Sequence, residues 1–252
     1  MDDKSLEILE FDRVREILAG FTSFPASREL TMAIHPLSDC EGISLLLRQS
    51  AEARQLLSLK PDFYLGEVGD IRQAVTMAAR GKVLQPQTIL EIRKALAAVR
   101  QVRSDLEELS KKVPLLWGIA SGIVPLPHLE KAIARCLQPS GEVLDSASRK
   151  LATVRQRLVQ VRKQVLGRLE AIMKTPQGIK IVQVPMVTER EGRYVIPIKM
   201  EFRKALKGIV HDVSNTGATA FVEPWGIMEL GNELRELVTE ERDEIERILA
   251  DL

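Results

Sequence analysis

Basic side chains gather in residues 190–207, where acids are few. Lysine and arginine neutralise phosphates without reading a base sequence, and such contacts weaken as salt rises. These side chains are therefore candidates for contact with a nucleic-acid backbone, and Arg203 with Lys204 comes closest to a backbone clamp. The alternative is a solvated basic surface on a small domain. The candidates are Arg190, Arg193, Lys199, Arg203, Lys204 and Lys207.

The pair His211-Asp212 is a second feature that could do chemistry. An HD pair can bind a metal ion, but it needs further His and Asp ligands, and no second ligand cluster is visible in the sequence. We therefore expect no metal site. Asp212 and Asn215 are expected to stabilise a turn backbone, and His211 is expected to pack on a sheet.

The motifs of several enzyme classes are missing from the sequence. There is no GxxxxGK[ST] phosphate loop and no GxGxxG, HExxH or GxSxG string. We expect no catalytic residue, no cofactor and no ATP hydrolysis in this stretch. Cys40 and Cys136 stand alone, which indicates a reduced, cytoplasmic protein. No apolar run is long enough to predict a membrane span.

Residues 1–140 have the pattern of a bundle of short helices, with 18 basic and 18 acidic residues. Apolar spacing, proline at first helical positions and capping residues mark the helix ends. Pro139-Ser140-Gly141 indicates a boundary. The expected helices run from Leu6 to Gly20, from Ser23 to His35-Pro36, from a cap at Asp39 to Leu59, from Asp70 to Arg80, from Pro86 to about Leu106, and near 114–121 and 127–137.

Two long helices of opposite charge follow. Residues 149–174 contain 8 basic and 1 acidic residue, and residues 223–252 contain 3 and 10. Each carries a narrow apolar seam, which predicts an antiparallel pair; the alternative is two unrelated helices. Arg155, Arg157, Arg162 and Lys163 are expected to pair with the acidic helix. The seams are Leu151, Val154, Leu158, Val161, Val165, Leu169 and Ile172, and Ile227, Leu230, Leu234, Leu237, Ile245, Ile248 and Leu252, with Glu241 as an interruption.

The apolar period changes to two between these helices, which predicts about four short strands. The first hairpin is expected to join Ile181–Val187 to Tyr194–Lys199 through the five-residue turn Thr188–Gly192. The second is expected to join Gly208–Val213 to Ala218–Glu223, because Ser214-Asn215-Thr216-Gly217 suits a tight turn. The fold class is therefore mainly α with a small β insert.

The string KGIVHDVSNTGATAFVEP at residues 207–224 resembles the clamp segment of a MutS-like paralogue family of bacteria. That family is associated with recombination control and ribosome rescue rather than mismatch correction. The resemblance extends to LEFDRVREILAGFTSFPASRELTMAIHP (9–36), VLQPQTILEIRKAL (83–96) and VIPIKMEFRKALKGIVHDVSNTGATAFVEP (195–224). The family signature, to which no chemistry is assigned, falls on Gly208, His211, Asp212, Gly217, Glu223 and Pro224.

The resemblance implies a helical core domain (1–140), an ascending lever helix (141–176), a β-rich clamp (177–223) and a descending lever helix (224–252). Because the last helix stops in mid-pattern, we expect a truncated protein. Full-length members of the family are ATP hydrolases that use ATP and Mg and form homodimers through an ATPase domain; many carry an endonuclease-like domain. They bind branched DNA, and some act on collided ribosomes.

The functional expectation is thus the clamp and lever portion of a MutS-like ATPase, with branched or mismatched DNA or ribosomal RNA as partner and no membrane association. The alternative is a coiled-coil adaptor that docks a protein through its β tip. An independent enzyme has little support. Salt dependence separates the first two, since only phosphate binding should weaken steeply with salt.

Overall fold

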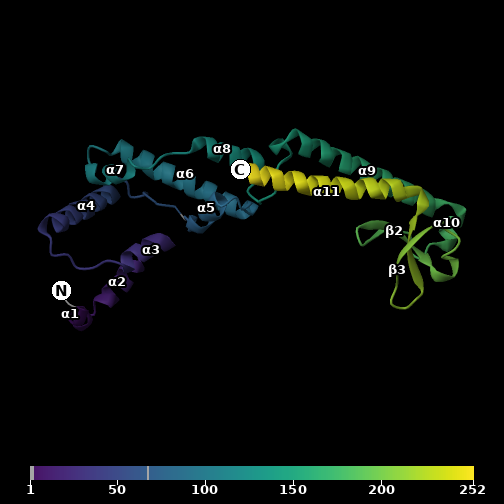
Figure 1. Cartoon of the computed structure of the whole chain (residues 1–252), viewed down its shortest axis with the longest axis horizontal. Coiled ribbons are helices and arrows are strands. Elements are labelled where there is room, and N and C mark those ends of the chain that lie inside the picture. Colours follow the sequence, from purple (N-terminus) through teal and green to yellow (C-terminus); the bar gives the residue numbers. More distant parts are fainter. Residues whose placement is uncertain (1–2, 67) are drawn as a thin grey trace. The chain divides into compact units, whose positions relative to one another are not determined.

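The computed structural model describes residues 3–66 and 68–252, which divide into two compact units (Figure 1). Unit 1 comprises Met1–Leu144 together with Leu249–Leu252, and unit 2 comprises Asp145–Ile248. Unit 1 is helical, and unit 2 combines two long helices with a small sheet. In the described residues, no helix is long and apolar enough to cross a lipid bilayer.

Unit 1 follows most of the predicted helix ends because local signals fix them. Proline occupies the first position of four helices, and the Asp39 carboxylate caps α4 by accepting from the backbone N–H groups of Glu41 and Gly42. The helices are α1 (Asp3–Ile8), α2 (Phe11–Ala19), α3 (Pro25–Met32), α4 (Cys40–Leu59), α5 (Arg72–Ala79), α6 (Pro86–Glu108), α7 (Pro114–Ala120) and α8 (Pro127–Cys136).

The single helix predicted from Leu6 to Gly20 is wrong. Glu10 adopts a left-handed conformation with φ of 50°, so α1 ends at Ile8 and α2 begins at Phe11. A left-handed residue cannot continue a right-handed helix. The predicted end of the next helix at His35-Pro36 is also late, because α3 stops at Met32.

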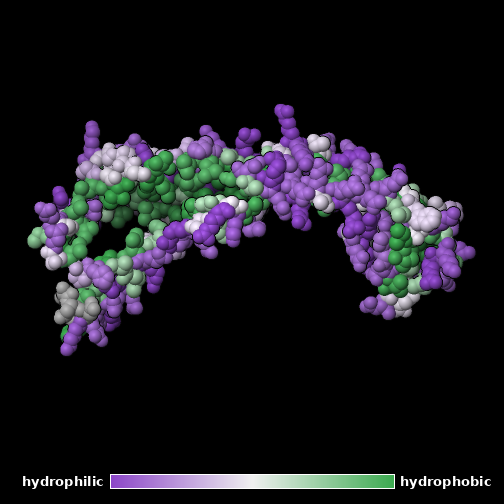
Figure 2. Space-filling model, in the orientation of Figure 1, coloured by the Kyte–Doolittle hydropathy of each residue, from purple (hydrophilic) through white to green (hydrophobic). Residues whose placement is uncertain are grey.

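The buried core of unit 1 is small for its length. One cluster joins α4, α6 and α7 through Leu56, Leu106, Val113 and Ala120. Many large apolar side chains of unit 1 remain exposed, and Figure 2 shows apolar surface along α6.

Unit 2 begins with a 3₁₀ turn and one long helix, carries its sheet in the middle, and continues into a second long helix. Ser148 caps the first helix, since its Oγ accepts from the backbone N–H of Leu151 at 2.9 Å. The elements are η1 (Asp145–Ala147), α9 (Arg149–Lys174), α10 (Pro176–Ile181), β1 (Thr188–Arg190), β2 (Arg193–Lys199), η2 (Met200–Phe202), β3 (Gly208–Val213), β4 (Thr219–Pro224), η3 (Trp225–Ile227) and α11 (Met228–Asp251).

Helices α9 and α11 run antiparallel within unit 2 (Figure 1). Near the start of α9 the partners are Glu240 and Glu241 on α11, whereas towards its end the partner is Gly226 in η3, as an antiparallel pair requires. The predicted pairing of these two helices is therefore confirmed for the residues in this unit. The bonds are Lys150–Glu240 at 3.4 Å, Arg155–Glu241 at 2.7 Å, Arg157–Glu233 at 2.6 Å and Arg168 to the Gly226 carbonyl at 2.8 Å.

The seam differs from its prediction at its ends. Met173, not Ile172, is the last buried residue of α9. On α11, Glu244 is buried and its Oε1 accepts from Ser148 Oγ at 2.7 Å. Arg162 and Lys163 are exposed and form no ion pair in the described residues, so their predicted pairing is wrong.

The sheet is antiparallel with strand order β1-β2-β4-β3. The strand predicted at Ile181–Val187 is wrong, because Ile181 ends α10 and only Val182 forms an isolated bridge, to Ile198. Two local signals favour the helix: Thr175 Oγ1 accepts from the Gly178 N–H at 2.9 Å, and Pro176 occupies the first helical position.

The two hairpins differ from their predicted lengths. β1 occupies most of the predicted five-residue turn, and the true turn is Glu191-Gly192, with φ of 51° and 72°. Two positive φ values in a two-residue loop fit the twist of a hairpin. The second hairpin is confirmed, with β4 starting one residue later, at Thr219. The central strands pack on the seam of α9 in one core that includes Val161, Val165, Ile196, Ile198 and Val222.

Candidate nucleic-acid interface

A β-bulge in β3 places His211 against a buried carboxylate. The β3–β4 register shifts between Val210 and Asp212, which leaves His211 as the extra residue. Its Nε2 lies 2.7 Å from Oε2 of Glu223, a side chain only 2% exposed. His211 therefore makes a polar contact across the sheet in addition to the packing predicted for it.

The second oxygen of Glu223 binds a predicted site residue. Arg193 Nη1 donates to Glu223 Oε1 at 3.2 Å, and Arg193 Nη2 donates to Asn232 Oδ1 at 2.7 Å. The Arg193 side chain is only 16% exposed. A β-carbon added to Gly231 would lie 2.7 Å from Glu223 Oε1, so the small residue on α11 makes room for the pair.

Several family-signature residues have structural positions in this network. A β-carbon on Gly208 would overlap the Glu223 carbonyl oxygen, so only glycine fits there beside β4. Gly217 has φ of 70° in the second hairpin turn, and Pro224 ends β4. In that turn Ser214 Oγ accepts from the Thr219 N–H at 3.0 Å, which is a role that the sequence suggested for Asn215.

Arg190 contacts two residues of the sheet, Phe221 and Asp212. Its guanidinium lies 4.3 Å from the centroid of the Phe221 ring, and its Nε lies 3.2 Å from Asp212 Oδ2. Asp212 also accepts from the Val213 N–H at 2.7 Å, so it has both the predicted backbone role and an ion pair. Because the Arg190 side chain is 40% exposed, it is intermediate between a structural and a free cation.

The other predicted cations lie in the segment between β2 and β3. Arg203, Lys204 and Lys207 are exposed and form no ion pair in the described residues. Lys199 Nζ donates to the Lys180 carbonyl at 3.3 Å, and that bond brings α10 to the same segment.

Helix α10 adds a cation that sequence reasoning missed. Gln177 Nε2 donates to the Ala205 carbonyl at 3.0 Å, and Lys180 Nζ lies 5.9 Å from the centroid of the Phe202 ring. Lys180 is exposed, and it was missed because the helix that presents it was predicted as the approach to a strand. We call the resulting set the basic loop surface: Lys180, Lys199, Arg203, Lys204 and Lys207.

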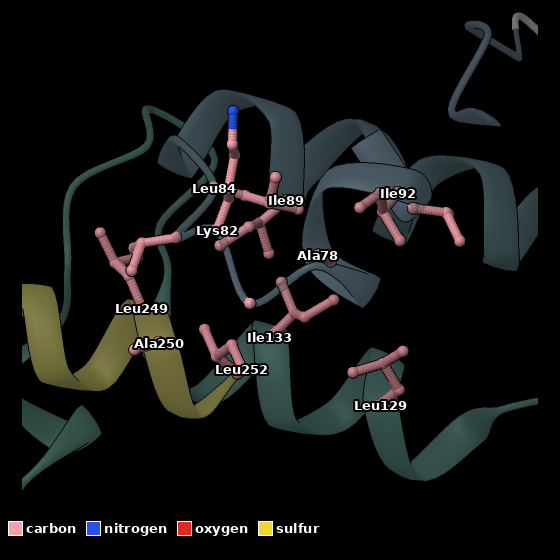
Figure 3. Close-up of a pocket in the computed structure, with 13 residues that line it drawn as sticks. Ala78, Lys82, Leu84, Ile89, Ile92, Leu129, Ile133, Leu249, Ala250 and Leu252 are labelled. Carbon is pink, nitrogen blue, oxygen red and sulfur yellow. The ribbon is translucent and has the colours of Figure 1, made fainter. Parts of the chain in front are cut away.

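A cavity in unit 1 has a mostly apolar lining. This cavity, of about 330 Å³, is lined by aliphatic side chains that include Ile89, Ile133 and Leu249. Lys82 lines it too, but its amine points away from the other lining side chains (Figure 3). In the described residues, no three His, Cys, Asp or Glu side chains come together as a metal site.

The chain is similar over its whole length to bacterial proteins, although no family model matches it. It is 42% identical to endonuclease MutS2 of Pelotomaculum thermopropionicum, 40% to endonuclease MutS2 of Thermomicrobium roseum and 37% to endonuclease MutS2 of Symbiobacterium thermophilum. The matches cover 99–100% of this chain and 32% of each relative, so the chain spans about a third of the length of these curated relatives.

Proposed function

We propose that this chain is a nucleic-acid-binding part of a MutS2-like protein and that phosphates bind at the basic loop surface. One observation carries the proposal: Arg203, Lys204 and Lys207 are exposed and have no carboxylate partner in the described residues. The similarity to proteins named endonuclease MutS2 supports DNA as the polymer.

The proposed contact is electrostatic and independent of base sequence. When solvent-facing lysine and arginine neutralise phosphates, the counterions condensed on the nucleic acid are released, which provides affinity and a steep salt dependence. We leave Arg193 out of this surface, because its guanidinium is held by Glu223 and Asn232. Arg190 contributes only in part, since Asp212 neutralises it.

The wider proposal concerns the whole protein. We propose that α9 and α11 act as a lever and that the sheet acts as a clamp on branched or mismatched DNA, with ribosomal RNA as the alternative polymer. In the whole protein we propose a homodimer that uses ATP and Mg. No ligand of ATP or Mg is assigned to this chain, which has no phosphate loop.

The test is a charge reversal with a matched control. Arg203→Glu with Lys204→Glu should weaken binding to a labelled four-way DNA junction and flatten the salt slope by roughly one unit per lost phosphate contact. Lys111→Glu with Lys112→Glu makes the same charge change on exposed residues of unit 1 and should leave both nearly unchanged. Equal effects of the two double variants, measured by fluorescence anisotropy, would contradict the proposal.

A second candidate function is protein docking, and one observation favours it. A groove of about 560 Å³ in unit 2 is lined by apolar side chains that include Leu166, Met173 and Ile179, and both Ile179 and Met186 are exposed. A helical partner could bury them. Binding of this kind would persist at high salt and would be insensitive to Arg203 and Lys204.

A further inference from the structure

Trp225 is an exposed aromatic residue beside the basic loop surface. Trp225 is 60% exposed and lies at the point where β4 passes into η3. The Trp225 backbone N–H donates to the Lys207 carbonyl at 3.1 Å, one position beyond the Gly208–Pro224 pair of the β3–β4 ladder. Lys207 and Trp225 therefore lie opposite each other along the backbone, just beyond the paired ends of β3 and β4.

A second cation reaches the same place from α9. Arg168 Nη1 donates to the carbonyl of Gly226, the residue after Trp225, at 2.8 Å. Arg168 is exposed and forms no ion pair with an acid in the described residues. A β-carbon added to Gly226 would meet no atom within 4 Å outside its two chain neighbours, so the backbone beside Trp225 is not crowded by other elements.

The charge around Trp225 favours an anionic ligand. Glu229, in the first turn of α11, is the acid nearest to Trp225 along that helix, and it forms no ion pair with Arg168 or Lys207. An exposed indole whose backbone neighbourhood includes two cations has the chemistry of a stacking platform, because every nucleobase has a π-face that can stack on an aromatic ring. The strand also carries a phosphate on either side of that base, which the cations can bind. An apolar partner alone would not require the two flanking charges.

We propose that Trp225 stacks on an unpaired base and that Lys207 and Arg168 hold the phosphates on either side of that base. The ligand class is nucleic acid with a single-stranded segment, such as a gap or the open centre of a branch. This inference rests on the proposed nucleic-acid function and deepens it. Phosphate contacts alone would treat paired and unpaired strands alike, whereas the indole can stack only on a base that has left its duplex.

The experiment uses the two tryptophans of the chain, Trp117 and Trp225. Trp117→Phe leaves Trp225 as the only tryptophan, and the variant is titrated with a fully paired duplex and with a gapped duplex of equal length. The gapped duplex should quench Trp225 fluorescence, and the paired duplex should not. In the otherwise unchanged chain, Trp225→Ala should weaken binding to the gapped duplex about tenfold and to the paired duplex less than twofold. Trp225→Phe should retain most of the affinity.

A matched control and the contrary outcomes separate this inference from the function on which it rests. Tyr64 is 62% exposed in unit 1, and Tyr64→Ala should not change either affinity. If Trp225→Ala leaves gapped-duplex binding unchanged while Arg203→Glu with Lys204→Glu still weakens both duplexes, stacking is overturned and the phosphate surface stands. If neither duplex binds at low salt, both proposals are overturned.

Discussion

Two groups of cations in the sheet region look alike in sequence and differ in structure. Arg190 and Arg193 flank the first hairpin turn, while Arg203 and Lys204 lie in the segment between the hairpins. The first two are bound by Asp212 and Glu223, whereas the second two have no acidic partner in the described residues. A count of basic residues therefore overstates the charge that this region offers to a ligand.

The difference arises from residues that are distant along the chain. Glu223 lies 30 residues after Arg193 and meets it only because β2 and β4 are neighbours in the sheet. Removing one partner from a buried ion pair leaves a charge without compensation, which is strongly unfavourable. Exposed cations carry no such penalty, and they remain available to phosphates.

Replacing Arg193 and Arg203 by alanine should give the largest contrast between the paired and the exposed cations. Arg193→Ala leaves Glu223 buried with only His211 beside it, and should lower the free energy of unfolding of unit 2 by about 3 kcal/mol. Arg203→Ala should change it by less than about 0.5 kcal/mol. Urea unfolding, followed by Trp225 fluorescence in a Trp117→Phe background, measures both. Equal losses would remove the distinction between the two groups.

Two glycines on or beside α11 sharpen the same contrast with a single methyl group. Gly231→Ala places a β-carbon 2.7 Å from Glu223 Oε1 and 3.0 Å from Arg193 Nη1, so the buried pair must shift, at a cost of about 2 kcal/mol. Gly226→Ala adds the same methyl group where no atom lies within 4 Å. We expect a lower thermal midpoint for the first variant only. A stable Gly231→Ala protein would indicate that the pair is loosely held.

Local signals let the sequence predict much of the helical structure. Helices α3, α6, α7 and α8 each begin at a proline, and Asp39 caps α4, as expected. The strand predicted at Ile181–Val187 was wrong because a short alternating run is also compatible with a helix end and an irregular segment. Thr175-Pro176 carries the helix signal, whereas the alternation from Ile181 onwards predicts a strand.

The site was harder to predict than the fold. Six cations were predicted to contact nucleic acid, and three of them, Arg203, Lys204 and Lys207, are exposed without an ion pair in the described residues. Arg168 was not among the predicted site residues, because cations of its helix such as Arg155 and Arg157 were expected to pair with α11. Trp225 was read only as a helix start, since nothing local shows that β3 brings Lys207 beside it.

A second buried carboxylate, Glu244, tests whether ion pairing also stabilises the pair of long helices. The Arg247 guanidinium, followed by the Ser148 hydroxyl, lowers the pKa of Glu244 from 4.5 to about 2. Because the folded pKa lies below the ordinary value, the stabilisation is fully present above pH 4.5 and is lost as the pH falls towards 2. Glu244→Gln should therefore flatten the loss of stability between these pH values.

The control for that change is Glu246→Gln, since Glu246 is exposed on the same helix and its one ion pair in the described residues is with exposed Arg242. Urea unfolding midpoints at pH 6 and pH 3 give the comparison. If both variants show the wild-type pH dependence, the buried contacts of Glu244 do not stabilise the helix pair.

Truncating Arg190 should have a smaller effect than truncating Arg193, because Arg190 belongs to both groups. It is 40% exposed, pairs with Asp212 and lies over Phe221, so Arg190→Ala should lower the free energy of unfolding by about 1 kcal/mol.

Arg190→Lys keeps the charge but not the planar guanidinium. If stacking on Phe221 is the main contribution, the lysine variant should lose nearly as much as alanine, and the loss should persist at high salt. If the ion pair is the main contribution, lysine should restore stability and salt should remove the difference between the variants. The second result would place Arg190 with the paired cations, and Arg190→Glu should then weaken junction binding less than Arg203→Glu.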